Sequence, residues 1–194
     1  MLTIEGSALR KFKVYAISIA LFFLVLAMIF LTPSIMAVYK KHFKDSAGSD
    51  EDFAIVIRAI DHMAEKKFNT AFSELEPIAE TKNRTAMYYL AYLYMTGQGV
   101  SQNYSEAMRL YNESAEMGDG QSQVMLSKIY AEGVVAERNP KKAYAWAAIA
   151  YSSDSTLSPT KAEAKTNMGL IAGELSRADL LRAQAEAASW KEKN

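Results

Sequence analysis

The sequence contains no cysteine and only two histidines. The absence of cysteine excludes disulfide bonds and thiolate ligands, and it fits either side of a membrane. His42 and His62 are far apart in the chain, and neither is part of a recognisable nucleophile, base and orienting group. We therefore predict no catalytic residue, no cofactor and no metal site, and we expect that the protein is not an enzyme.

Charge is missing from one long stretch, residues 14–31. As a helix, these 18 residues span roughly 27 Å, close to the thickness of a bilayer's hydrocarbon core. A cleaved signal peptide would have a shorter apolar region with small residues before the cut, and a buried globular helix would carry a polar face. We predict a short tail at 1–13 and a single transmembrane helix at 14–38, in contact with the lipid bilayer.

The basic residues that flank this segment leave its orientation open. Three lie on each side of it: Arg10, Lys11 and Lys13, then Lys40, Lys41 and Lys44. Because the N-terminal side is short, we favour a cytoplasmic N-terminus, which places the rest of the chain in the periplasm of a bacterial inner membrane. Residues 1–44 carry a net charge of +5 and the remainder −5. An acidic domain is poorly suited to nucleic acid, so none is expected as a partner.

Beyond a basic stem and polar linker at 39–52, apolar residues recur at spacings of three and four, as in helices. Glycine and proline then separate the segments, and no strand is predicted. A kink or a break is expected at Pro77, because proline lacks the N–H that a helix needs. The helices are expected at 53–66, 70–80, 85–96, 104–117, 122–131, 140–151, 160–175 and 178–191. The fold class is thus predicted to be all-α.

The most informative pattern is a repeat with a period of 36 residues. Six aligned pairs carry it: Ala86 and Ser122, Leu90 and Leu126, Tyr94 and Tyr130, Gly97 and Gly133, Ala107 and Ala143, Leu110 and Trp146. Periods of this length are typical of helical arrays, in which each helix pair buries its apolar face against the next pair.

The repeat resembles the Sel1-like repeat, a relative of the tetratricopeptide repeat. The positions that carry the resemblance are Ala86, Leu90, Tyr94, Gly97, Gly99, Ala107 and Ala115 in one copy, and Leu126, Tyr130, Gly133, Ala143 and Trp146 in the next. The second copy departs from the family by having Val135 in place of the second turn glycine. The resemblance implies a short α-solenoid of stacked antiparallel helix pairs, in which these residues are structural.

About three repeats are expected over 53–151: a degenerate one at 53–82, which lacks the turn glycines, and two clearer ones at 85–118 and 121–151. Residues 159–193, which include Trp190, look like the capping helix pair that often closes such arrays.

A candidate partner-binding face lies on the first helix of each repeat. Tyr88, Tyr92 and Met95 lie nearly opposite Ala86 and Leu90 at 100° per residue. The second repeat places Val124 and Lys128 at the matching positions. Tyrosine and methionine are common where partners bind, but the same residues would also pack well against a neighbouring helix. Both interpretations remain open from the sequence.

Members of this family with one N-terminal membrane segment are typically envelope proteins that assist larger complexes. The resemblance therefore implies an interaction scaffold or adaptor with protein partners from the envelope or membrane. The alternative is an accessory subunit of a membrane complex that associates mainly through its transmembrane helix, where Ala16, Ala20 and Ala27 form a face of small residues.

Overall fold

The computed structural model describes residues 49–153 and 156–193. The predicted tail, the transmembrane helix at 14–38 and most of the stem lie outside these residues. Within the described part, no helix combines the length and the apolar character that crossing a membrane requires.

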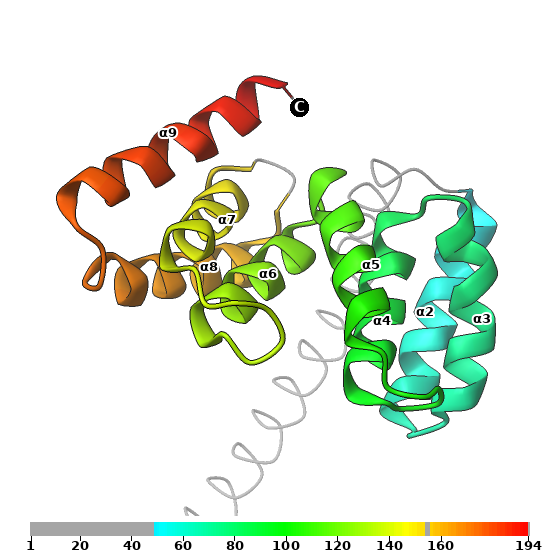
Figure 1. The fold of residues 1–194 in the computed structure, drawn as a ribbon. Helices are drawn as coiled ribbons and strands as arrows, with labels where there is room; N and C mark the ends of the chain where they lie inside the picture. Colours follow the sequence, from blue (N-terminus) through cyan, green and yellow to red (C-terminus); the bar gives the residue numbers. More distant parts are fainter. Residues whose placement is uncertain (1–48, 154–155, 194) are drawn as a thin grey trace, which may run out of the picture. The chain divides into compact units, whose positions relative to one another are not determined.

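The described residues form eight helices and no strand, which confirms the all-α prediction (Figure 1). The helices are α2 (Asp50–Ala64), α3 (Phe68–Glu80), α4 (Arg84–Thr96), α5 (Tyr104–Glu116), α6 (Gly120–Glu132), α7 (Pro140–Ser152), α8 (Ser158–Ala172) and α9 (Arg177–Lys193). The pairs α2–α3, α4–α5 and α6–α7 pack as hairpins, and α3 packs on α4 and α5 on α6 to join successive pairs. This is a helical-repeat solenoid.

The helix starts repeat with the same period of 36 residues. Asn83 and Asp119 cap α4 and α6, and Asn103 and Asn139 cap α5 and α7. Each side chain accepts from a backbone N–H of the first turn, as in the 2.7 Å contact from Ser122 N to Asp119 Oδ1. Capping satisfies donors that the helix itself leaves without partners. The 36-residue period therefore appears in the capping residues at the helix starts as well as in the apolar faces.

The turns inside the two hairpins are closed in the same way. Gly97 and Gly133 end α4 and α6 with φ of +68° and +72°, a conformation that glycine adopts without strain. The backbone N–H groups of Asn103 and Asn139 then donate to the carbonyls of Tyr94 and Tyr130, at 2.9 and 2.8 Å. Because both loops have the same length and the same hydrogen bond, the two hairpins have matching geometry.

The second glycine of the turn is required in the α4–α5 hairpin but not in the α6–α7 hairpin. Gly99 has φ of +74°, and a Cβ there would lie 2.4 Å from the backbone of Phe68 at the start of α3. Val135 stands at the equivalent place, does not have a positive φ, and packs against the core. The departure at Val135 is therefore compatible with the fold, because its backbone adopts a conformation open to any residue.

Half of the repeat positions lie in the buried core. Ala86, Ala107, Ala115, Leu126 and Ala143 are fully buried, and Leu90 is 5 % exposed. Tyr94, Tyr130 and Trp146 are half-buried and pack against the cluster that contains Ala86, Leu90 and Leu126. Alanine at the buried positions allows the helix backbones to approach closely, and the aromatic rings fill the space between pairs.

A buried polar chain joins the two regular hairpins. Ser114 Oγ donates to the carbonyl of Arg84 at 2.7 Å, and Ser122 Oγ donates to Ser114 Oγ at 2.8 Å. Gln123 Nε2 also donates to the carbonyl of Ala115 at 3.0 Å. The chain links α4, α5 and α6, so the junction depends on specific hydrogen bonds as well as on apolar packing.

Two expectations need correction. The first is the alternative of a break at Pro77, because α3 continues through this residue to Glu80. Leu75, Ile78 and Ala79 around the proline are all buried. The free energy gained by burying these side chains offsets the hydrogen bond that Pro77 cannot donate. The proline also lies close to the end of α3.

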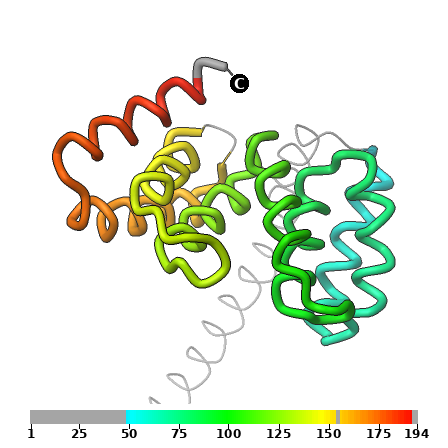
Figure 2. The backbone as a smooth tube through the Cα atoms, in the orientation of Figure 1, coloured from blue at the N-terminus to red at the C-terminus, as the bar shows by residue number. Residues whose placement is uncertain are grey.

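The second correction concerns the C-terminal helices, which do not pair with each other as a hairpin. Both α8 and α9 pack mainly on α7, which lies between them, and α8 also contacts α6 (Figures 1 and 2). Ile171 of α8 and Ala183 of α9 belong to one apolar cluster with Ala143. At the C-terminal end of the array, α8 and α9 therefore cover two sides of α7.

Candidate functional site

The predicted tyrosine face on α4 is partly occupied by intramolecular packing. Tyr88 forms edge-to-face contacts with Tyr89, with ring centroids 5.0 Å apart, and lies 5.8 Å from the ring of buried Tyr111. Burial raises the pKa of Tyr88, and the neighbouring Tyr89 and Asp119 add to the shift. Tyr92 and Met95 are half-buried beside the same core. A partner-binding role for these three residues stays a prediction.

The two positions on α6 differ from each other. Val124 is 3 % exposed and packs with Ala150 and Ala164, so the expectation that it contacts a partner is corrected. The helices α7 and α8 cover it, whereas its counterpart Tyr88 on α4 is only half-buried. Lys128 keeps an accessible side chain and forms an ion pair with Glu163 of α8. The face predicted from the repeat is therefore not continuous from α4 to α6.

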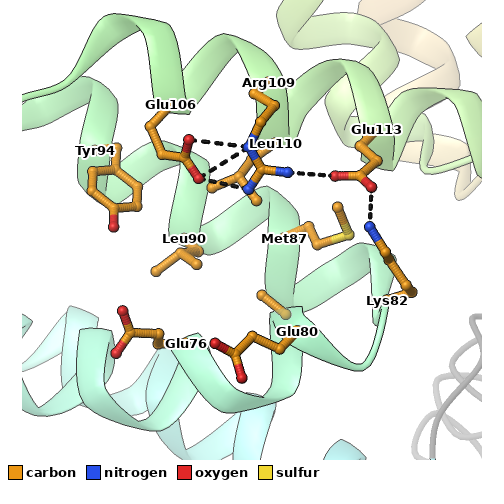
Figure 3. A pocket seen from close by; sticks show the side chains of 11 residues that line it. Glu76, Glu80, Lys82, Met87, Leu90, Tyr94, Glu106, Arg109, Leu110 and Glu113 are labelled. Atoms are coloured by element: carbon orange, nitrogen blue, oxygen red, sulfur yellow. Dashed lines mark hydrogen bonds and ion pairs between the residues drawn. The ribbon is translucent and has the colours of Figure 1, made fainter.

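A groove lies on another part of the array, between α3 and α5 with α4 beneath it (Figure 3). It has a volume of about 330 Å³. Its floor is apolar and comprises Ala79, Met87, Leu90, Tyr94 and Leu110. Its rim is charged and comprises Glu76, Glu80, Lys82, Glu106, Arg109 and Glu113. We call this feature the acidic groove, because four carboxylates and two cations leave a net charge of −2.

The α5 wall of the acidic groove is a chain of paired charges. Arg109 donates to both oxygens of Glu106, at 2.6 to 3.1 Å, and its other terminal nitrogen donates to Glu113 at 2.7 Å. Glu113 also forms an ion pair with Lys82 (Figure 3). The hydrogen bond from Arg109 lowers the pKa of Glu106. Both cations of the groove are thus engaged by carboxylates of the same wall.

The α3 wall is different. Glu76 and Glu80 lie one helical turn apart, are exposed, and point into the groove (Figure 3). Neither has an ion-pair partner among the described residues. Like charges at this spacing destabilise a helix by about 0.2–0.5 kcal/mol. Burial raises the pKa of Tyr94, and the carboxylates of Glu76 and Glu106 contribute to the shift. The groove is therefore a region of unbalanced negative charge.

Sequence reasoning did not find this groove. Its only linear signal is the acidic spacing: Glu76 and Glu80 on one helix, and Glu106, Arg109 and Glu113 on another. Such spacing is common on solvated helix faces. What makes it a site is the packing of α3 and α5 on α4, which no local pattern predicts.

Comparison with known proteins agrees with the repeat geometry. Residues 84–119 and 120–155 each match the model of the Sel1 repeat. The chain therefore contains two consecutive segments that match the Sel1 repeat. The first repeat comprises α4 and α5, the second comprises α6 and α7, and each begins where a buried Asn or Asp caps the first helix. Proteins with Sel1 repeats generally mediate protein–protein interactions.

Two solved structures have a similar fold. One is a protective antigen of uropathogenic Escherichia coli strains that displays an SLR fold, with a TM-score of 0.67 and 22 % identity over 73 % of this chain. The other is a Sel1 repeat protein from Oxalobacter formigenes, with a TM-score of 0.54 and 26 % identity over 70 % of this chain. The match covers 30 % and 55 % of those two chains. No curated protein matches the chain.

Proposed function

We propose that this protein is a membrane-anchored interaction scaffold that holds a partner protein on its helical repeats in the bacterial envelope. The observation that carries the proposal is the two segments that match the Sel1 repeat, which stack on a further helix pair. Such an array offers a broad surface of side chains from several helices, and it is the architecture through which Sel1-repeat proteins generally act.

The membrane part of the proposal rests on the sequence. Residues 14–31 carry no charge and are flanked by basic residues on both sides. A helix over 14–38 would anchor the repeats to a bilayer, and the residues between it and α2, which begins at Asp50, would act as a short tether. A tethered scaffold meets membrane-bound partners at a high local concentration, which raises the occupancy of weak sites.

The first experiment compares partner capture by two forms of the protein. The full-length chain and a version in which a cleavable secretion signal replaces residues 1–44 are crosslinked in cells, and the captured proteins are identified. The scaffold proposal predicts the same partners for both forms, although in lower yield without the anchor. Circular dichroism checks that the shorter form keeps its helices. Loss of every partner would favour the alternative, an accessory subunit that associates through its transmembrane helix.

A second experiment tests the side of the membrane. Alkaline phosphatase, which is active only outside the cytoplasm, is fused after Asn194. The proposal predicts an active fusion in the membrane fraction. An inactive fusion, with activity only for a cytoplasmic reporter at the same position, would place the repeats inside the cell.

A further inference from the structure

The acidic groove has an uncompensated negative wall above an apolar floor. Lys82 and Arg109 are engaged by Glu106 and Glu113 on the α5 side. Glu76 and Glu80 on the α3 side are left without a cation among the described residues. A bound cation would relieve the repulsion between these two carboxylates.

The shape of the groove limits which cation fits. The carboxylates follow one another along a helix, and no group of three or more His, Cys, Asp or Glu among the described residues could hold a metal ion. The floor contains Leu90, Leu110 and the half-buried ring of Tyr94. A lysine or arginine side chain matches both parts, because its aliphatic stem covers apolar surface while its charged head reaches a carboxylate.

We propose that the acidic groove binds a basic segment of a partner protein, which places two Lys or Arg side chains over the floor with their charged groups on Glu76 and Glu80. The volume of about 330 Å³ accommodates a few side chains but not a whole helix. The partner's backbone therefore lies along the rim, between α3 and α5. This inference rests on the proposed scaffold function and names the chemistry of its partner.

The test uses the full-length chain in a mild non-ionic detergent and a set of short fluorescent peptides, with binding followed by anisotropy. The parent peptides carry two lysines at every spacing from one to four residues. In one matched series diaminopropionate replaces lysine, which keeps the charge and removes most of the stem. In the other, norleucine keeps the stem and removes the charge. The proposal predicts binding by at least one lysine spacing, and loss of binding for both replacements.

The protein variants locate the site. The double variant Glu76→Gln/Glu80→Gln should weaken binding of the best lysine peptide by about tenfold at low ionic strength. The matched control is Glu132→Gln/Glu137→Gln, which makes the same change in net charge at two exposed residues outside the groove. The control should bind within about twofold of the unaltered chain. Equal weakening in both variants would show a general charge effect and overturn the proposal.

Three other outcomes would also overturn it. If no lysine spacing binds, the groove does not take a basic segment. If spermidine displaces the best peptide and binds as tightly as it does, the site takes a small polyamine. If a peptide covering residues 38–46 binds more tightly than any other, the occupant is the chain's own basic stem.

Crosslinking in cells separates this inference from the function on which it rests. Partners captured equally by the unaltered chain and by Glu76→Gln/Glu80→Gln would leave the scaffold function standing and place the contact elsewhere. Capture of no partner by either chain would instead count against the scaffold function.

Discussion

Close contacts between successive helix pairs depend on single residues, and Gly99 is the clearest case. Its positive φ and its approach to the backbone of Phe68 leave no room for a side chain. Gly99→Ala should lower the free energy of unfolding by about 2 kcal/mol or more, because strain and a backbone clash add together.

Gly169 offers a matched control for this change. It lies in α8, and a Cβ there would meet nothing within 4 Å. Gly169→Ala should therefore stabilise the protein by up to about 1 kcal/mol. Urea denaturation followed by circular dichroism measures both variants. Equal effects at the two sites would contradict the close contact at Gly99.

The ionised form of Asp119 destabilises the folded state. It caps α6 from a buried position, and burial raises its pKa even though Ser122 and Arg84 oppose the shift. A carboxyl whose pKa is raised on folding favours the protonated form of the folded state. Stability therefore rises as pH falls through the folded-state pKa, and this gain is complete below the unfolded-state value.

The equivalent cap one repeat earlier is Asn83, which is neutral. Asp119→Asn should keep the cap and stabilise the protein at pH 7, and the gain should shrink as the pH is lowered through the folded-state pKa of Asp119. Unfolding free energies measured from neutral to acidic pH test this. A loss of stability at pH 7 would show that the carboxylate is held favourably by Arg84.

At the scale of the helix, the regular caps explain why the boundaries were predictable. Asn139 before Pro140 and the glycines after α4 and α6 are local signals, and the observed helices begin and end close to the expected residues. Helix propensity and capping act within a few residues, so a single sequence contains them.

The packing of the helices on one another is harder to predict from the sequence. The separate placement of α8 and α9 on α7 depends on which faces are left free after the earlier pairs have packed. Val124 was misjudged for the same reason, because α7 and α8 cover it. The acidic groove likewise exists only once α3 and α5 have packed on α4.

The caps give a prediction at this scale. Asn103 Oδ1 accepts from the backbone N–H of Glu106 at 3.0 Å at the start of α5. Asn103→Ala should cost about 1 kcal/mol of unfolding free energy, and Asn103→Ser should restore most of it. Thermal denaturation compares the two variants. If serine is no better than alanine, the cap does not stabilise α5.

At the scale of the whole molecule, the array is held by shared buried positions. Ala143 is fully buried in a cluster that joins α7 to Ile171 of α8 and Ala183 of α9. Ala143→Glu would bury a carboxylate without a partner, at a cost of about 3 kcal/mol or more. We expect loss of cooperative unfolding in the C-terminal helices.

Ala162→Glu is the matched control, since Ala162 is exposed on α8. This variant should unfold at nearly the same denaturant concentration as the unaltered chain. A normal transition for Ala143→Glu would contradict the alignment of the two repeats.

The proposed scaffold function requires a partner to bind on the surface of the repeats. The most direct test is photocrosslinking in cells, with benzoylphenylalanine replacing one residue of the full-length chain at a time. The positions are exposed Arg109 on the rim of the acidic groove, Tyr92 on the tyrosine face, and exposed Glu137 as the control. We predict a discrete partner adduct from Arg109 and none from Glu137. An adduct from Tyr92 alone would move the site to the tyrosine face, and the absence of adducts from both surfaces would contradict the scaffold function.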